Sequence, residues 1–179
     1  ERGSDDCEVD VMCPEGDSWQ CERDAVVKLR ITQGGGIYLC SGAMVNNTER
    51  DCRQLLLSAF HCADAVEENE WAYFKVQYNY EYLVCDSTVS INSHTRTGVI
   101  PLTNSDDATS QGFSGSDFLL VEVEDPISAT WNPYYAGFDA SGETGHSGVG
   151  IHHPSGDRKK ISTYTNPLTT YSLGSAGSH

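Results

Sequence analysis

The residue with the clearest potential for chemistry is His61, which directly follows an apolar segment and precedes a cysteine. The segment before it, 54–59 (QLLLSA), has the composition of a fully buried strand. A histidine at the end of such a strand is held rigidly, and a disulfide through Cys62 would fix its backbone further. General-base catalysis requires this placement, because a proton moves across a hydrogen bond of about 3 Å. The pattern is therefore one that a general base at His61 would need, and a structural histidine at a strand end is the alternative.

An acidic partner for this histidine is suggested by Asp117, which opens the segment 117–123 (DFLLVEV). All five apolar side chains of this segment are expected to enter a core, with Glu122 and Glu124 facing outward. A carboxylate at the start of such a strand is expected to be half-buried and to need a partner. The imidazole of His61 would be one, and the carboxylate would then fix its tautomer and stabilise the imidazolium. The alternative is a surface aspartate at a strand start.

The elements that must position these residues have β patterns almost throughout. Alternating apolar and polar residues, or short apolar runs between turn residues, predict strands at 25–32, 38–45, 54–59, 72–80, 117–123, 134–138, 149–153 and 160–164. Only 63–70 suggests a helical turn, and 103–115 has the Ser, Thr, Asn, Asp and Gly content of a long surface loop. Short strands separated by turns indicate an all-β sandwich or barrel.

Composition narrows the class of protein. The net charge of −15 argues against a nucleic-acid partner, because such binding depends on clustered Lys and Arg. No apolar stretch approaches the roughly 20 residues that span a bilayer, so no membrane partner is expected. Seven cysteines without a zinc-binding spacing indicate an oxidising compartment, and therefore secretion, with any targeting segment already removed. The adjacent His152 and His153 would point to opposite faces of a strand, and neither a metal nor another cofactor is expected.

The strand Cys40-Ser41-Gly42-Ala43-Met44-Val45, followed by Ser58-Ala59-Phe60-His61-Cys62, resembles a motif pair of trypsin-like serine proteases. The chain is most similar to bacterial lysyl endopeptidases. Further shared motifs run in order along nearly the whole chain, at 13–16 (CPEG), 44–47 (MVNN), 116–118 (SDF), 135–139 (YAGFD), 151–154 (IHHP) and 160–162 (KIS). A Cys40–Cys62 disulfide would close a loop worth roughly 3 kcal/mol in the chain-entropy model.

This resemblance implies an all-β fold of two six-stranded antiparallel β-barrels, the second incomplete in this chain. The N-terminal segment and the first barrel would occupy residues 1–125, and the start of the second barrel would occupy 126–179. The implied activity is that of a secreted serine endopeptidase, with a suggested preference for lysine and with protein or peptide substrates. His61 would be its general base and Asp117 the orienting carboxylate. A monomeric enzyme is expected.

The serine nucleophile is expected beyond His179, because the family order is His, Asp, then a Gly-x-Ser-Gly turn in the second barrel. Ser114 lies in such a pattern but only three residues before Asp117, so it cannot also occupy the facing barrel. Ser147 fits the bare pattern but follows Asp117 by only 30 residues. The fragment alone is therefore expected to be inactive. The alternative is a protease-like binding or adhesion module that lost its serine.

The resemblance also implies a pairing of the cysteines. Cys13 would bond to Cys85 and Cys40 to Cys62, and the two additional cysteines, Cys21 and Cys52, would then bond to each other. Cys7 is left over, so its partner is expected in a missing C-terminal segment of the same protein.

Overall fold

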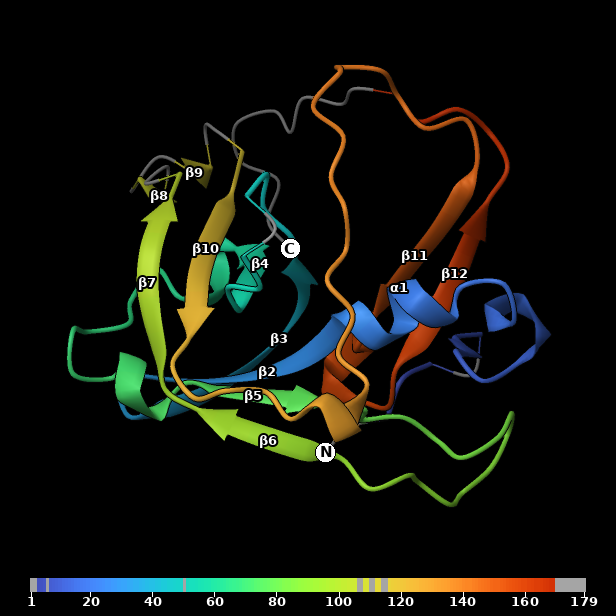
Figure 1. The fold of residues 1–179 in the computed structure, drawn as a ribbon, viewed down its shortest axis with the longest axis horizontal. Coiled ribbons are helices and arrows are strands. Elements are labelled where there is room, and N and C mark those ends of the chain that lie inside the picture. Colours follow the sequence, from blue (N-terminus) through green and yellow to red (C-terminus); the bar gives the residue numbers. More distant parts are fainter. Residues whose placement is uncertain are drawn as a thin grey trace.

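The computed structural model describes residues 3–5, 7–49, 51–105, 108–109, 112–113 and 116–169. Regular structure in these residues is nearly all β, in antiparallel sheets (Figure 1). The strands are β1 (Val9–Asp10), β2 (Val26–Gln33), β3 (Gly36–Val45), β4 (Leu55–Ala59), β5 (Lys75–Tyr78), β6 (His94–Thr97), β7 (Val99–Asn104), β8 (Ala108–Thr109), β9 (Gly112–Phe113), β10 (Phe118–Val123), β11 (Gly148–His152) and β12 (Lys160–Tyr164). The helical segments are η1 (Pro14–Gly16), α1 (Gln20–Ala25), η2 (Phe60–Cys62), η3 (Trp71–Tyr73), η4 (Ala129–Trp131) and η5 (Pro154–Gly156). The all-β prediction is confirmed.

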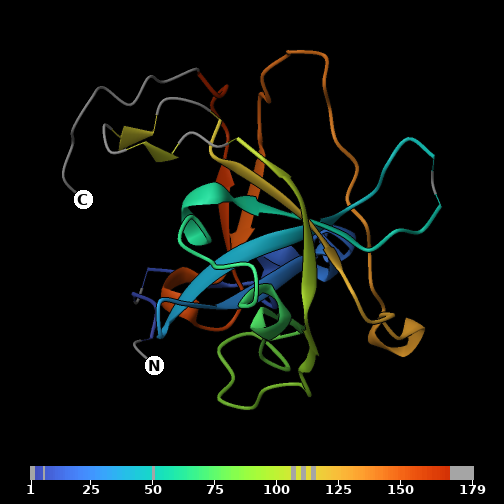
Figure 2. The same cartoon turned by 90° about the vertical axis from the view of Figure 1, so that its left-hand side faces the viewer.

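The largest sheet has the order β6-β5-β2-β3-β4-β10-β7 and curls until its two ends meet (Figure 2). Its end strands, β6 and β7, are consecutive in the chain and are joined through Gly98. The Gly98 N–H donates to the Phe74 carbonyl (2.9 Å), and the Gly98 carbonyl accepts from the Glu124 N–H (3.3 Å). With φ at +94° and the Glu124 carboxylate 3.0 Å from where a Cβ would lie, this position favours glycine. If β6 and β7 are counted as one bent strand, six strands surround the core.

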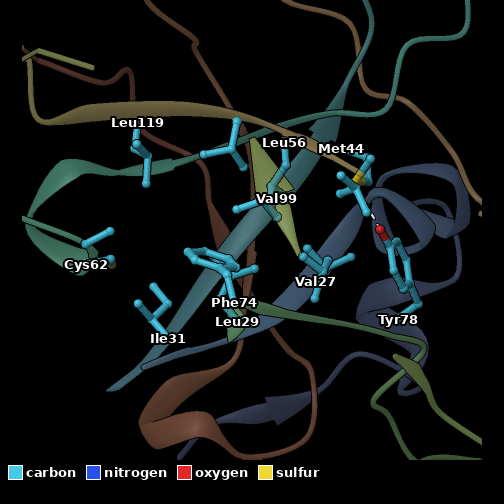
Figure 3. Packing of buried hydrophobic residues seen from close by; sticks show 14 residues of the cluster. Val27, Leu29, Ile31, Met44, Leu56, Cys62, Phe74, Tyr78, Val99 and Leu119 are labelled. Atoms are coloured by element: carbon cyan, nitrogen blue, oxygen red, sulfur yellow. Dashed lines mark hydrogen bonds between the residues drawn. The ribbon is translucent and has the colours of Figure 1, made fainter. Parts of the chain in front are cut away.

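The core lies inside this curled sheet (Figure 3). Strand β2 shows why, because Val27, Leu29 and Ile31 alternate along it and all three are fully buried. Strand β10 corrects the expectation that all its apolar side chains enter the core. Only every second residue of β10 is buried, while Phe118 and Leu120 point to the other face and remain partly exposed.

A second, three-stranded sheet has the order β1-β12-β11. It is the part of the incomplete second barrel that the described residues form. Strands β11 and β12 were predicted, whereas the two-residue β1 was not. Its register places Val9 opposite Ile161 and Asp10 opposite Lys160. The N-terminal residues therefore belong to this sheet, while the predicted boundary at residue 125 stays a prediction.

Several elements differ from the prediction. The segment 134–138 forms only an isolated bridge between Ala136 and Val45, and 63–70 lies between η2 and η3 without forming a helix. The structure adds α1, β6 and β7, and β7 extends into the segment predicted as a loop. Strands β6 and β7 lack an apolar alternation, and we attribute their formation to pairing with β5 and β10, which supplies backbone partners that local composition does not reveal.

The disulfides Cys13–Cys85 and Cys40–Cys62 are both present. The predicted Cys21–Cys52 bond is wrong, because both cysteines are free and exposed. Cys21 lies in α1 and Cys52 in the connection between β3 and β4, and a disulfide requires the two Cα atoms to come within about 7 Å. Cys7 is also free and exposed in this chain, so its bond to another segment stays a prediction. None of the described helices is both long and apolar enough to cross a membrane.

Candidate active site

The pairing of β4 with β10 brings His61 and Asp117 together. These strands are antiparallel, with Ala59 opposite Phe118, so the end of one lies beside the start of the other. One further backbone bond continues the ladder, from the Phe60 N–H to the Asp117 carbonyl at 3.0 Å. His61, two residues after the end of β4, and Asp117, directly before β10, therefore lie at the same corner of the sheet, although 56 positions separate them in the chain.

The Asp117 carboxylate holds His61 at two points. Its Oδ1 accepts from the His61 backbone N–H at 2.9 Å, and its Oδ2 lies 2.6 Å from the imidazole Nδ1. Asp117 has a left-handed backbone with φ of +48°, a conformation that aspartate tolerates better than most residues. Because an ionised carboxylate can only accept, the imidazole would donate to it through Nδ1. The predicted contact is confirmed, and the catalytic roles of the two residues stay predictions.

The imidazole is open to solvent while its backbone is anchored. The His61 side chain is 51% exposed, and that of Asp117 is 29% exposed, in line with the half-buried position expected for it. Immediately after His61, Cys62 is buried and bonded to Cys40 of β3. The ring is thus accessible to a reacting group, and the disulfide and the strand fix the atoms from which it extends.

The other histidine of interest, His153, is built into the structure. It is buried, and its Nδ1 lies 2.9 Å from the Asp157 carbonyl. Burial, reinforced by the nearby positive charge of Lys159, lowers the pKa of His153 to about 3. It is therefore neutral at physiological pH. Its backbone N–H donates to the Ser41 hydroxyl at 2.8 Å, which ties this segment to β3.

Of the two candidate serine patterns, one lies in part outside the described residues and the other lies in an exposed segment. Ser114 and Gly115 lie outside the residues that the structure describes. Ser147 belongs to the exposed segment 137–147 that leads into β11. The residues here are also poor ligands for a metal ion. The sulfur atoms of Cys40 and Cys62 lie within 4.8 Å of a ring nitrogen of His61, but they are joined in a disulfide and offer no thiolate.

Sequence reasoning missed a buried charged cluster that joins the two sheets. The Lys159 side chain is fully buried, and its Nζ lies 3.1 Å from Glu81 Oε2 and donates to the Arg23 carbonyl at 2.7 Å. Its backbone N–H donates to the Tyr80 carbonyl at 3.0 Å. Burial lowers the pKa of Lys159, and the Glu81 carboxylate opposes that shift. Nothing in the sequence signalled this pair, since isolated Lys and Glu residues are ordinarily at the surface.

Comparison with known proteins identifies the family. Residues 2–179 match the family described as "Lysyl endopeptidase, C-terminal domain". The chain is also 30% identical over 171 residues to a lysyl endopeptidase of Pseudomonas aeruginosa, an alignment that covers 89% of this chain and 34% of that protein. The chain thus spans about a third of the length of this curated relative. With its all-β, trypsin-like fold, the chain belongs to the lysyl endopeptidase C-terminal domain family.

Proposed function

We propose that the protein containing this chain is a secreted serine endopeptidase that cleaves peptide bonds after lysine by a Ser–His–Asp mechanism. The observation that carries this proposal is the two-point contact of the Asp117 carboxylate with His61, at 2.9 Å and 2.6 Å, beside an exposed imidazole. Membership of a protease family supports the reaction class. Two disulfides support an extracellular location.

In this mechanism His61 moves protons and Asp117 stabilises it. A serine supplied by another part of the protein attacks the scissile carbonyl, and Nε2 of His61 takes the hydroxyl proton. Asp117 stabilises the resulting imidazolium through Nδ1. The imidazolium then gives its proton to the leaving amine as the carbon–nitrogen bond breaks, which leaves an acyl-enzyme. A water molecule, deprotonated by His61, attacks the ester and releases the acid and the free serine.

Two components of this proposal, the preference for lysine and the serine nucleophile, are not carried by the described residues. The preference follows the name of the relative from Pseudomonas aeruginosa. The serine and the substrate pocket are expected in the remainder of the protein, to which Cys7 would be disulfide-bonded.

The test uses the full-length secreted protein and a fluorophosphonate probe, followed by mapping of the labelled residue. We expect labelling at a serine other than Ser114, its loss in His61→Ala, and its retention in His146→Ala, a variant of an exposed histidine in the 137–147 segment. Matched peptides with Lys, Arg or Ala before the scissile bond then measure specificity. Labelling of Ser114, or a folded protein that neither reacts with the probe nor cleaves peptides, would contradict the proposal.

A further inference from the structure

The lysines of this chain are distributed unusually. It contains four of them, at positions 28, 75, 159 and 160, and three are buried, with exposed fractions of 1% for Lys28, 0% for Lys159 and 8% for Lys160. Lysine is ordinarily among the residues least often buried. None of the described arginines is buried; these are Arg23, Arg30, Arg53, Arg96 and Arg158. Among the described residues, burial is therefore a property of lysine and not of basic side chains in general.

The ammonium group of each buried lysine lies near a carboxylate or an aromatic ring. Lys159 pairs with Glu81, as described above. The Lys28 Nζ lies 4.0 Å from the centre of the Tyr80 ring, and the Lys160 Nζ lies 5.5 Å from that of Tyr82. Removing an ammonium group from water is unfavourable and needs such compensation. A lysine at the surface would need no such compensation. Solubility therefore does not explain why these lysines are buried.

The backbone at the lysines is as inaccessible as the side chains. Lys28, Lys75 and Lys160 lie in β2, β5 and β12, each of which is hydrogen-bonded to a neighbouring strand on both sides. Lys159 adjoins β12, and its carbonyl accepts from the Val11 N–H at 3.2 Å. Even Lys75, whose side chain is exposed, therefore has its backbone inside the sheet. A protease binds its substrate as an extended segment, and a strand must first lose its hydrogen bonds to neighbouring strands before it can be bound in this way. Cleavage of the peptide bonds after these lysines therefore requires unfolding.

The exposed connections show the opposite composition, because they contain no lysine. The segments 46–54, 82–93, 124–135 and 137–147 together carry seven acidic residues and two arginines but not one lysine. Residues 137–147 are all exposed and project away from the strands in both overall views (Figure 1, Figure 2). Such loops are the preferred sites of proteolytic cleavage in folded proteins.

We propose that this chain resists digestion by its own activity because it confines lysine to backbone that cannot enter a protease cleft. The proposal rests on the lysine preference proposed above. Self-cleavage would break the bond between a lysyl carbonyl carbon and the following nitrogen, with water supplying the hydroxyl to the new acid and the proton to the new amine. With no lysine in the exposed connections of this chain, a lysine-specific protease has no bond to cut there until the fold opens.

The experiment places a single lysine in the exposed loop of the full-length active protein. Glu143→Lys provides the susceptible residue, and Glu143→Arg is the matched control, with the same charge and nearly the same length. The Glu143 side chain is exposed in the 137–147 segment, away from His61 and Asp117 in the chain. Intact-mass analysis over time records the loss of full-length chain and the position of each cut, and a Lys peptide assay is run on the same samples.

We expect Glu143→Lys to be cut after position 143 and to lose its intact chain at least about tenfold faster than the wild type, because loop opening is frequent and strand opening is rare. Glu143→Arg should last as long as the wild type. If the wild type cleaves Lys peptides but Glu143→Lys is as durable as the wild type, lysine placement does not control self-digestion and the inference is overturned. The same holds if both variants are cut equally. If the wild type cleaves no Lys peptide, the proposed function itself fails and this inference fails with it.

Discussion

Two pairs of a basic and an acidic side chain in this molecule differ in what surrounds them. His61 and Asp117 meet where two strands end, with side chains 51% and 29% exposed and nitrogen and oxygen 2.6 Å apart. Lys159 and Glu81 meet between the two sheets, with side chains 0% and 3% exposed and 3.1 Å apart. The first pair is held by backbone and a disulfide beside it, whereas the second is enclosed by packing. The pair that is open to solvent can take part in proton transfer, whereas the enclosed pair can contribute to the stability of the fold.

Removing one partner should therefore affect different quantities in the two places. Loss of a partner in the open pair can be compensated by water, so the fold should survive while the chemistry fails. Loss of Lys159 from the enclosed pair leaves Glu81 buried away from water, with Arg23 at 3.6 Å as its remaining ionic partner, so the fold should suffer. Four predictions test this division, all in the full-length protein.

The largest expected effect follows from Asp117→Asn. The amide can no longer enforce the proton on Nδ1, so Nε2 is no longer reliably the base, and kcat should fall by roughly 10⁴-fold. The midpoint of urea unfolding should shift much less than in the variant of the enclosed pair described next. Asp64→Asn, three residues after His61 and exposed, is the control and should retain full activity. An active Asp117→Asn protein would remove Asp117 from the mechanism.

The next effect is on stability, from Lys159→Met. This change leaves Glu81 buried with one ionic partner fewer and should lower the free energy of unfolding by about 3–5 kcal/mol. Urea unfolding of probe-inactivated protein measures it without self-digestion. Lys75→Met, at the exposed lysine, is the matched control and should change little. Equal effects of the two substitutions would mean that the enclosed pair is not special.

A smaller effect concerns pH and His153. Its pKa is about 3 in the folded chain against an ordinary value of 6.5, so the unfolded chain binds a proton in the interval between these values and the folded chain does not. Stability should therefore fall as the pH drops below about 6.5, by about 2 kcal/mol at pH 5. His153→Asn cannot titrate, and the difference between wild type and variant should vary with pH by that amount. A pH-independent difference would contradict a neutral buried imidazole.

The smallest effect is expected from a third pair, Arg53 and Glu122, whose atoms approach to 2.6 Å at the surface. The proximity of Arg53 lowers the pKa of Glu122. Such exposed pairs contribute little, because water screens them and the side chains lose freedom. Arg53→Gln should leave the midpoint of urea unfolding unchanged within error. A loss comparable to that of Lys159→Met would show that short distance, rather than enclosure, decides the contribution.

The open pair was predictable and the enclosed pair was not, for physical reasons. An apolar strand that ends two residues before His61 and another that begins directly after Asp117 are local patterns, and antiparallel pairing brings such ends together. The expectation that the first of these strands is fully buried is wrong, because Leu57 of β4 is 41% exposed. The left-handed backbone of Asp117 has no signature in the sequence. Lys28 alternates with apolar neighbours in a way that indicates an outward side chain, yet Tyr80 covers it. Which residue packs over the outer face of a strand depends on distant parts of the chain.

The same limit explains the errors in the fold and the disulfides. Strands β6 and β7 carry Pro101 and several polar residues, and their pairing with strands already in place outweighs that composition. The Cys21–Cys52 bond was predicted only because these two cysteines are additional to those of the family, and that reasoning includes no geometry. Cys40–Cys62 and Cys13–Cys85, by contrast, were predicted from the resemblance to lysyl endopeptidases and are present.

The bend at Gly98 has a consequence for the durability of the corner that holds His61. Strand β10 is paired with β4 on one side and β7 on the other, and the bend at Gly98 ties β7 to the opposite margin of the sheet, so β10 cannot peel away from one side. Separating Asp117 from His61 then requires disruption of the whole cylinder, and the rate of amide hydrogen exchange at Phe60, whose N–H bonds to Asp117, should approach that set by global unfolding. Alignment of the two side chains would persist for as long as the molecule remains folded.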